Sequence, residues 1–170
     1  MSTPYAQTLS RSVARFEALY LQSKAENVQL IDRKGNLIGE ANRGTSRGVS
    51  LNKAQKELAM AGKASASIHN HPNNVPIWIG DVKMVRHYRL SRVIVVTEEG
   101  RSEFVAPRTG WGDSSTVMKG EHAWNDTMGK KVSSAKYGHE SGYLALCHRA
   151  NEAVAKATGW KYRRKERTCH

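Results

Sequence analysis

Two histidines two positions apart, followed downstream by an aspartate, are the residues whose types and spacing could do chemistry. His69 and His71 end an apolar stretch, and Pro72 follows them directly. On a β-strand, residues two apart project from the same face, so both imidazoles can face one metal ion while Asn70 points away. Asp81 lies ten positions after His71, at the start of a segment with helical periodicity. A His, His, Asp set that leaves a fourth position to water is the arrangement of catalytic zinc.

Two simpler interpretations of the His-x-His segment bear on this hypothesis. A single His-x-His pair is common on surface strands that bind no metal, and only the proline and the downstream aspartate favour a metal site. The letters HNH at positions 69–71 also name a group of nucleases. In that group the residues are dispersed along a motif, so three adjacent letters do not indicate a nuclease.

The apolar periodicity of the chain predicts the elements that would position these side chains. Thr3 and Pro4 are typical of a helix start, and a glycine-bearing turn at 32–36 between two apolar runs predicts a β-hairpin. The expected elements are a helix with the stripe Leu9, Val13, Phe16 and Tyr20, strands at Asn27–Ile31 and Leu37–Ala41, a helix capped by Asn52, a strand at Ala64–His71, a helix at Asp81–Arg92, and strands at Val93–Val96 and Ser102–Ala106. This order predicts an α/β (mixed α+β) fold, in which helices flank a mixed sheet.

The residue composition of the chain changes beyond Pro107. Residues 108–131 are rich in Gly, Ser, Thr and Asp, which predicts an irregular segment. An apolar face recurs over residues 142–158 and predicts a helix. The basic run Lys161–Arg167 is expected to be a tail, either a disordered polyanion-binding segment or a solubilising one. We therefore expect a zinc domain at 1–107 and a C-terminal extension at 108–170 packed on it.

The aromatic and imidazole side chains of the C-terminal third have no ligand spacing of their own. His122, His139 and His148 are therefore interpreted as structural. Three tryptophans, Trp111, Trp124 and Trp160, are expected to pack this segment on the core. A surface on which nucleic-acid bases stack is the alternative interpretation.

The order of these motifs resembles the signature of the JAB/MPN (JAMM) zinc metallopeptidase family, and within it the RadC-like branch of bacteria and phages. In that signature, His-x-His-Pro is followed by Ser-x-x-Asp. The matching residues here are His69, His71 and Pro72 for the first part, Asp81 for the last, Glu26 directly before the hairpin, and Gly44 and Thr45 in the connection after it. The resemblance covers about residues 17–105 and leaves the C-terminal third unexplained.

The resemblance implies a cytidine-deaminase-like JAB/MPN core with one bound Zn²⁺ ion, and His69, His71 and Asp81 as its ligands. It also implies Glu26 as the general base, which takes a proton from zinc-activated water and passes it to the leaving amine. Glu40, on the returning strand of the hairpin, is the competitor for this role. The implied activity is hydrolysis of a peptide or isopeptide amide bond.

Two departures from the family pattern bear on that activity. Trp78 stands where the family has a serine, three positions before Asp81, and it has no hydroxyl to stabilise an oxyanion. The ten positions from His71 to Asp81 are one fewer than the commonest family spacing. Loss of one oxyanion donor lowers rates by about 10²–10³-fold. The metal site can thus be kept while peptidase activity is weak, unless a hydroxyl at 45–50 or a backbone amide supplies the donor.

The charge of the chain bears on its partners. It has 27 basic and 15 acidic residues, a net charge of +12. Such a charge attracts nucleic acid, acidic proteins or anionic lipid without choosing among them. The residues considered for a nucleic acid or acidic protein partner are Lys83, Arg86, Arg89, Arg163 and Arg164. Two rival functions follow, a nucleic-acid-binding RadC-like protein with weak or no peptidase activity and a metal-dependent nuclease.

The cysteine and hydropathy patterns indicate the compartment. Cys147 and Cys169 are far apart and lack CxxC spacing, so neither a disulfide framework nor a thiolate zinc site is expected. The sequence has no run of apolar residues long enough for a membrane span and no signal-like start. These patterns predict a cytoplasmic protein without a membrane partner. A phage protein in the host cytoplasm would have the same composition.

Overall fold

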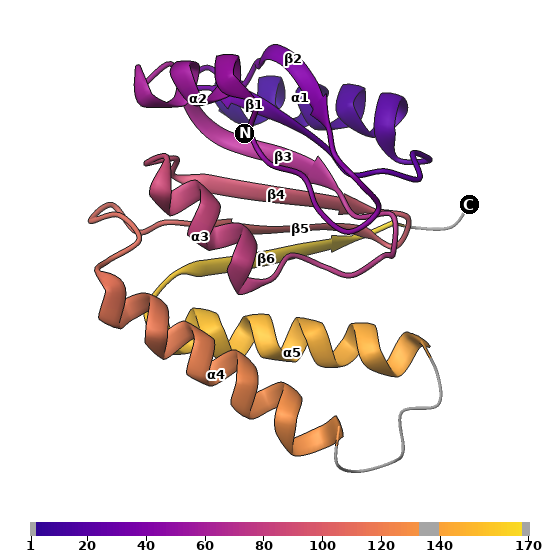
Figure 1. Ribbon diagram of the computed structural model, residues 1–170, viewed down its shortest axis with the longest axis vertical. Coiled ribbons are helices and arrows are strands. Elements are labelled where there is room, and N and C mark those ends of the chain that lie inside the picture. The colour runs from indigo at the N-terminus through magenta and orange to yellow at the C-terminus, as the bar shows by residue number, and fades with distance from the viewer. Residues whose placement is uncertain (1–2, 133–139, 168–170) are drawn as a thin grey trace.

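The computed structural model describes residues 3–132 and 140–167, and in it helices cover a six-stranded mixed sheet (Figure 1). The helices are α1 (Pro4–Tyr20), α2 (Lys53–Met60), α3 (Ile79–His87), α4 (Ser114–Val132) and α5 (Glu140–Thr158). The strands are β1 (Asn27–Asp32), β2 (Leu37–Arg43), β3 (Ala64–Asn70), β4 (Arg92–Thr97), β5 (Gly100–Val105) and β6 (Lys161–Glu166). The mixed α/β fold class expected from the sequence is confirmed.

The strand order is β2-β1-β3-β4-β5-β6. β3 and β4 are parallel, whereas the other neighbouring pairs are antiparallel. A parallel pair needs a crossover connection, and α3 supplies it. The continuous β-branched run Val93–Val96 lies in β4 and is fully buried, as expected for a central strand covered on both faces.

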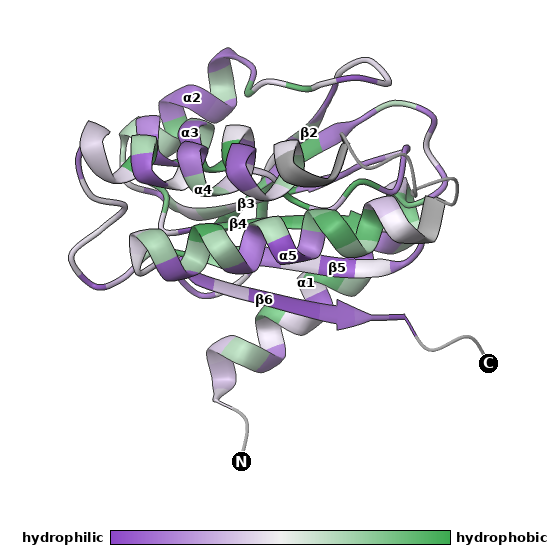
Figure 2. Ribbon diagram, turned by 90° about the horizontal axis from the view of Figure 1, so that it is seen from below, coloured by the Kyte–Doolittle hydropathy of each residue, from purple (hydrophilic) through white to green (hydrophobic). Residues whose placement is uncertain are grey.

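The helices are divided unequally between the two faces of the sheet, as the edge-on view in Figure 2 shows. α1 covers one face, where its Val13 and Phe16 pack on Ile68 and Ile94. The other four helices lie on the opposite face. Because side chains alternate along a strand, Ser67 and His69 of β3 point to this second face. None of the helices in the described part of the chain is long and apolar enough to cross a bilayer.

Residues 108–131 were expected to be irregular, and this expectation is wrong, because most of the segment forms α4. Asp113 caps the helix, since its carboxylate accepts the backbone N–H of Thr116 at 2.9 Å. Gly120 lies where α4 packs closely, and a Cβ there would be 3.0 Å from Ile79 Cδ1. The polar and glycine residues that suggested a loop therefore serve a helix cap and a close helix contact.

The basic run at the C-terminus was expected to be a tail, and this too is wrong, because it forms edge strand β6. Tyr162 pairs with Phe104 of β5, and the two ring centroids are 5.1 Å apart. The Tyr162 hydroxyl also bonds His148 Nδ1 at 2.5 Å. One aromatic side chain thus anchors the strand, and the sheet crosses the boundary expected at residue 107. The charged side chains of β6 protect this edge from pairing with other chains.

Candidate metal centre

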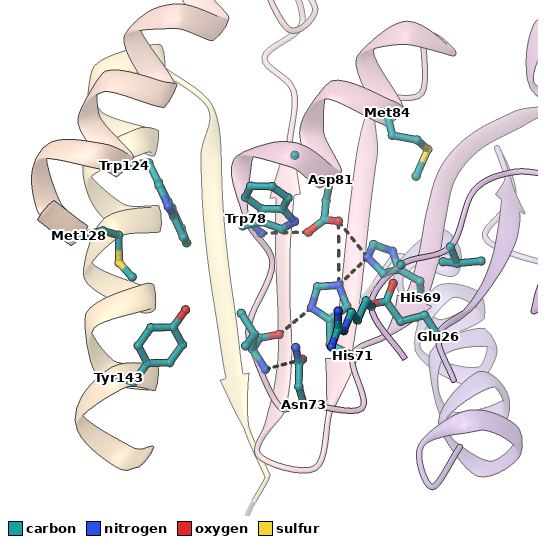
Figure 3. Close-up of a pocket in the computed structure, with 15 residues that line it drawn as sticks. Glu26, His69, His71, Asn73, Trp78, Asp81, Met84, Trp124, Met128 and Tyr143 are labelled. Atoms are coloured by element: carbon teal, nitrogen blue, oxygen red, sulfur yellow. Dashed lines mark hydrogen bonds and ion pairs between the residues drawn. The ribbon is translucent and has the colours of Figure 1, made fainter. Parts of the chain in front are cut away.

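The structure brings His69, His71 and Asp81 together at the end of β3 (Figure 3). The two histidine Nε2 atoms are 3.1 Å apart. Asp81 Oδ1 lies 3.2 Å from Nε2 of His69 and 3.9 Å from Nε2 of His71. Both histidines are buried, and the aspartate side chain is 13% exposed. Three ligand atoms from two elements therefore point to one place.

Strand pairing fixes the two histidines on one side of the sheet. β3 pairs on both edges, with β1 at Val28↔His69 and with β4 at His69↔Val95. The pairing continues one residue beyond the strand, because the His71 N–H donates to Val96 O at 3.0 Å. His71 therefore keeps the orientation of the strand although Pro72 ends it.

The first turn of α3 positions Asp81. The helix begins at Ile79, two residues earlier than expected, which makes Asp81 the third helical residue. Its Oδ2 accepts the backbone N–H of Trp78 at 3.0 Å, an N-terminal helix contact. One carboxylate oxygen is thus used to hold the side chain, and the other faces the histidines.

A backbone carbonyl sets the tautomer of His71. Its Nδ1 lies 2.7 Å from Val75 O, and a carbonyl can only accept, so Nδ1 carries the proton and Nε2 keeps its lone pair. The sequence alone does not reveal this partner, which comes from the loop after Pro72.

Nδ1 of His69 and Oγ of Ser67 are both buried without a hydrogen-bond partner among the described residues.

These residues fit a zinc ion. Zn²⁺ binds imidazole nitrogen and carboxylate oxygen at about 2.0–2.2 Å in a tetrahedron, whose edges are then about 3.3–3.5 Å. The three measured separations of 3.1, 3.2 and 3.9 Å surround this value. The donor set of two imidazoles and one carboxylate also matches catalytic zinc, in which a fourth position is open.

Glu26 lies beside this group because of the β1–β3 register. The antiparallel pairing of Val28 with His69 places Glu26 opposite His71, just before β1 begins. Its backbone N–H and C=O both bond the connection after β2, at Thr45 O and the Gly44 N–H, each at 2.8 Å. The side chain lines the same cleft as the three ligands (Figure 3). Glu40, its competitor, is exposed on β2 and does not line the cleft.

The electrostatics of Glu26, His71 and Asp81 suit metal binding and proton transfer. Burial raises the pKa of Glu26. The charge of His69 opposes this increase, and the charge of Asp81 adds to it. Burial and the neighbouring His69 lower the pKa of His71, so its ring is neutral near pH 7. Burial alone would raise the pKa of Asp81, but both histidines and the Trp78 N–H lower it below its usual value. A neutral imidazole and an ionised carboxylate are the forms that bind metals.

The cleft holds about 600 Å³ and has a second wall that was not expected from the sequence. Trp124 and Met128 of α4 and Tyr143 of α5 face the metal ligands across it (Figure 3). The i, i+4 spacing of Trp124 and Met128 would have indicated a shared helix face, had the segment been interpreted as a helix. The predicted packing role fits Trp111 and Trp160, which are buried against each other with ring centroids 5.3 Å apart.

The basic residues considered for a partner do not form one surface. Lys83 of α3 pairs with Glu121 of α4, and Arg86 of α3 donates to Gly112 O, in the connection before α4, at 3.1 Å. Arg89 is exposed beyond the end of α3. Arg163 lies 3.4 Å from Glu103, and Arg164 lies 3.7 Å from Glu166, on β6. The partner prediction stays a prediction.

Comparisons of the chain with protein-family models, with curated proteins and with solved structures find no match. The resemblance to the JAB/MPN family thus stays a prediction from the motif.

Proposed function

We propose that this protein is a JAB-like, zinc-dependent hydrolase of peptide or isopeptide amide bonds. The observation that carries the proposal is the convergence of His69 Nε2, His71 Nε2 and Asp81 Oδ1 within 3.9 Å of one another. Glu26 on the wall of the same cleft supports it. A cytoplasmic location, supported by the free thiol of Cys147, belongs to the same proposal.

Glu26 moves the proton in this proposal. Zn²⁺ at the site would supply Lewis-acid chemistry, polarising the substrate carbonyl and lowering the pKa of a water to about 7. The Glu26 carboxylate accepts a proton from the attacking water and gives it to the amine nitrogen as the C–N bond breaks. The water oxygen stays on the carbonyl carbon, so one acid and one amine are released. Burial raises the pKa of Glu26 and so favours its uptake of a proton, whereas a bound Zn²⁺ ion would lower this pKa.

The ligands are held before the substrate binds. The bond from His71 Nδ1 to Val75 O and the bond from the Trp78 N–H to Asp81 Oδ2 restrict the rotation of two ligand side chains. Rigid ligands keep the reacting groups at a fixed separation, which is a large part of catalysis.

The hydrogen-bond donor that would stabilise the oxyanion is not the serine of the family pattern, because Trp78 stands at that position. The connection at 45–50 contributes Arg47, Gly48 and Val49 to the cleft, and its hydroxyls are not among the described lining residues. Trp78 lines the cleft as an indole. We therefore propose a hydrolase that lacks the serine donor of the family and is about 10²–10³-fold slower, unless a backbone N–H of this connection or the Trp78 indole N–H stabilises the oxyanion.

The test is Glu26→Gln beside the matched control Glu40→Gln. We expect Glu26→Gln to lower kcat for peptide hydrolysis by about 10²–10⁴-fold while zinc content is kept, because a general base is lost and the ligands remain. Glu40→Gln should leave kcat unchanged, since that carboxylate is exposed on β2. Equal effects of the two substitutions, or full activity of Glu26→Gln, would contradict the proposal.

A nucleic-acid-binding protein is the second candidate function, and the exposed edge strand β6 favours it. Lys161, Arg163 and Lys165 lie at two-residue intervals on this strand and are all exposed. Side chains two apart share a face of the sheet, so the three cations form a row, in which Arg163 is also paired with Glu103 at 3.4 Å. Such a row can neutralise successive phosphates of one nucleic-acid strand.

Salt-dependent binding tests this candidate. We expect the double substitution Lys161→Glu and Lys165→Glu to weaken DNA or RNA binding and to reduce the salt slope by about 0.7–0.9 for each phosphate that is no longer neutralised. Lys34→Glu with Lys53→Glu, two exposed lysines elsewhere, is the control of equal charge. Equal effects of both pairs would show general attraction to a basic protein and would exclude a dedicated surface.

A further inference from the structure

The second wall of the cleft is built from an apolar stripe that continues beyond the core. Along α4, Val117, Trp124 and Met128 follow helical spacing, with Gly120 between them. Val117 and Gly120 are buried where α4 packs on the domain. Trp124 and Met128, one and two turns further, are only half-buried and line the cleft. The first half of the stripe therefore packs on the core, and the second half faces His69, His71 and Asp81 across the cleft.

Two further aromatic side chains extend this surface. Tyr143 of α5 is 43% exposed and Trp78, before α3, is 47% exposed, yet both line the cleft. The Trp78 ring lies against the backbone of Gly80, where an added Cβ would be 2.4 Å from the ring. We call these four side chains, Trp78, Trp124, Met128 and Tyr143, the aromatic wall. Large apolar groups gathered at a cleft are typical of a binding site.

We propose that the aromatic wall is a subsite for a large apolar or aromatic side chain of a polypeptide substrate, next to the bond that is cleaved. This inference rests on the proposed amide hydrolysis. Figure 3 shows Trp124, Met128 and Tyr143 across the cleft from His69, His71 and Asp81, with Trp78 beside Asp81. A carbonyl placed at His69, His71 and Asp81 therefore directs a neighbouring side chain toward the wall.

The charges of the cleft favour a polypeptide over a nucleic acid as the occupant. Surfaces on which bases stack are accompanied by a basic groove that follows the phosphates. The described lining residues include two carboxylates, Glu26 and Asp81, and a single cation, Arg47. The basic row of β6 lies on another element. Apart from the proposed zinc ion, the described lining therefore has no row of cations along which a phosphate chain could run beside the aromatic wall.

The experiment measures side-chain preference with the full zinc-loaded chain. Peptides of one length carry Ala, Asp, Lys, Leu or Phe at each position beside the cleaved bond. We expect Phe and Leu to raise kcat/KM about 10- to 100-fold over Ala at one of these positions, because the wall removes their apolar surface from water. Met128→Ala and Tyr143→Ala should reduce this ratio several-fold while zinc content stays the same.

The matched control is Met118→Ala, on the same helix. Met118 is 54% exposed and does not line the cleft, so its substitution should leave the Phe-to-Ala ratio unchanged. An unchanged ratio in Met128→Ala and Tyr143→Ala, or an equal loss in Met118→Ala, overturns the inference.

A binding measurement separates this inference from the proposed function. If no peptide is hydrolysed, the proposed function fails, and the same peptides are titrated into zinc-loaded Glu26→Gln protein and followed by tryptophan fluorescence. Tighter binding of the Phe peptide, abolished in Met128→Ala, supports the aromatic wall as a peptide subsite. Equal binding of the Phe and Ala peptides overturns it. A single-stranded oligonucleotide that displaces the peptide, and whose own binding Met128→Ala weakens, also overturns it and assigns the wall to bases.

Discussion

Asn70, between the two histidines, is predicted to position Glu26. Its side chain points to the other face of the sheet, where its Oδ1 accepts the Asn27 N–H at 2.7 Å and the Asn27 amide at 3.2 Å. Its Nδ2 donates to Ala25 O at 3.1 Å. These bonds fix the residues before and after Glu26, so Asn70→Ala should loosen the segment that carries the carboxylate.

The expected cost follows from which partners Asn70→Ala leaves unsatisfied. Ala25 O keeps bonds from Ser23 Oγ and the Asn27 amide, each at 2.9 Å. The buried Asn27 N–H loses its side-chain acceptor. One unsatisfied buried group costs about 1–3 kcal/mol. In a chain of this size, each kcal/mol lowers the unfolding temperature by about 2–4 °C.

The catalytic effect should exceed the stability effect. A displacement of about 1 Å in a catalytic group can lower kcat about 10²-fold. We therefore expect Asn70→Ala to lower kcat by about 10- to 100-fold, with zinc content kept because His69 and His71 retain their strand pairing. Thermal unfolding, zinc analysis and steady-state kinetics measure the three quantities.

The matched control for Asn70→Ala is Gln29→Ala, on the neighbouring strand β1. The Gln29 amide donates to Gly39 O at 2.6 Å in an exposed setting, where water can replace it. Its removal should change neither the unfolding temperature nor kcat by much. If Asn70→Ala behaves like Gln29→Ala in both measurements, the positioning role of Asn70 is refuted.

Further predictions concern the helices that support the cleft. Gly120→Val should destabilise the protein by about 1–3 kcal/mol through overpacking. Gly129→Ala should instead stabilise α4 by up to about 1 kcal/mol, because no neighbouring atom lies within 4 Å of an added Cβ. Urea unfolding of the two variants measures both effects. Asn52→Ala removes the capping box of α2 and should cost about 1 kcal/mol in the same assay. Hydrogen bonds from Thr116 lower the pKa of Asp113 to about 2. The ionised Asp113 carboxylate therefore stabilises the folded state at pH values above 3.8, its pKa in the unfolded chain, and this stabilisation is lost as the pH falls toward 2. The difference in unfolding temperature between wild type and Asp113→Asn should therefore shrink over that range, and a constant difference would contradict the cap.

The convergence of His69, His71 and Asp81 could be predicted from the sequence because its geometry is local. The two-residue period of a strand places His69 and His71 on one face whatever the rest of the fold does. Asp81 needed only a helix start after the loop. The position of Glu26 could not be derived in this way, because it depends on the Val28↔His69 register between two strands. The resemblance to a family suggested it, and the structure places it in the cleft.

The C-terminal third was misinterpreted because tertiary contacts decide its structure. Gly120 weakens a helix prediction, yet close packing on Ile79 favours a residue without a side chain there. The charged strand β6 has only Tyr162 as an apolar anchor, and this residue is effective because Phe104 and His148 surround it. Local composition carries no information about such partners. The aromatic wall was missed for the same reason, since it appears only once α4 is a helix.

Metal analysis of the purified protein tests the central claim most directly. We predict about one zinc ion per chain in the wild type and none after simultaneous substitution of His69, His71 and Asp81 by alanine, with the fold retained by circular dichroism. Zinc should persist in Glu26→Gln, since that carboxylate is not a ligand. Absence of stoichiometric zinc in the wild type after growth and purification with added zinc, or zinc that survives the triple substitution, would contradict the account.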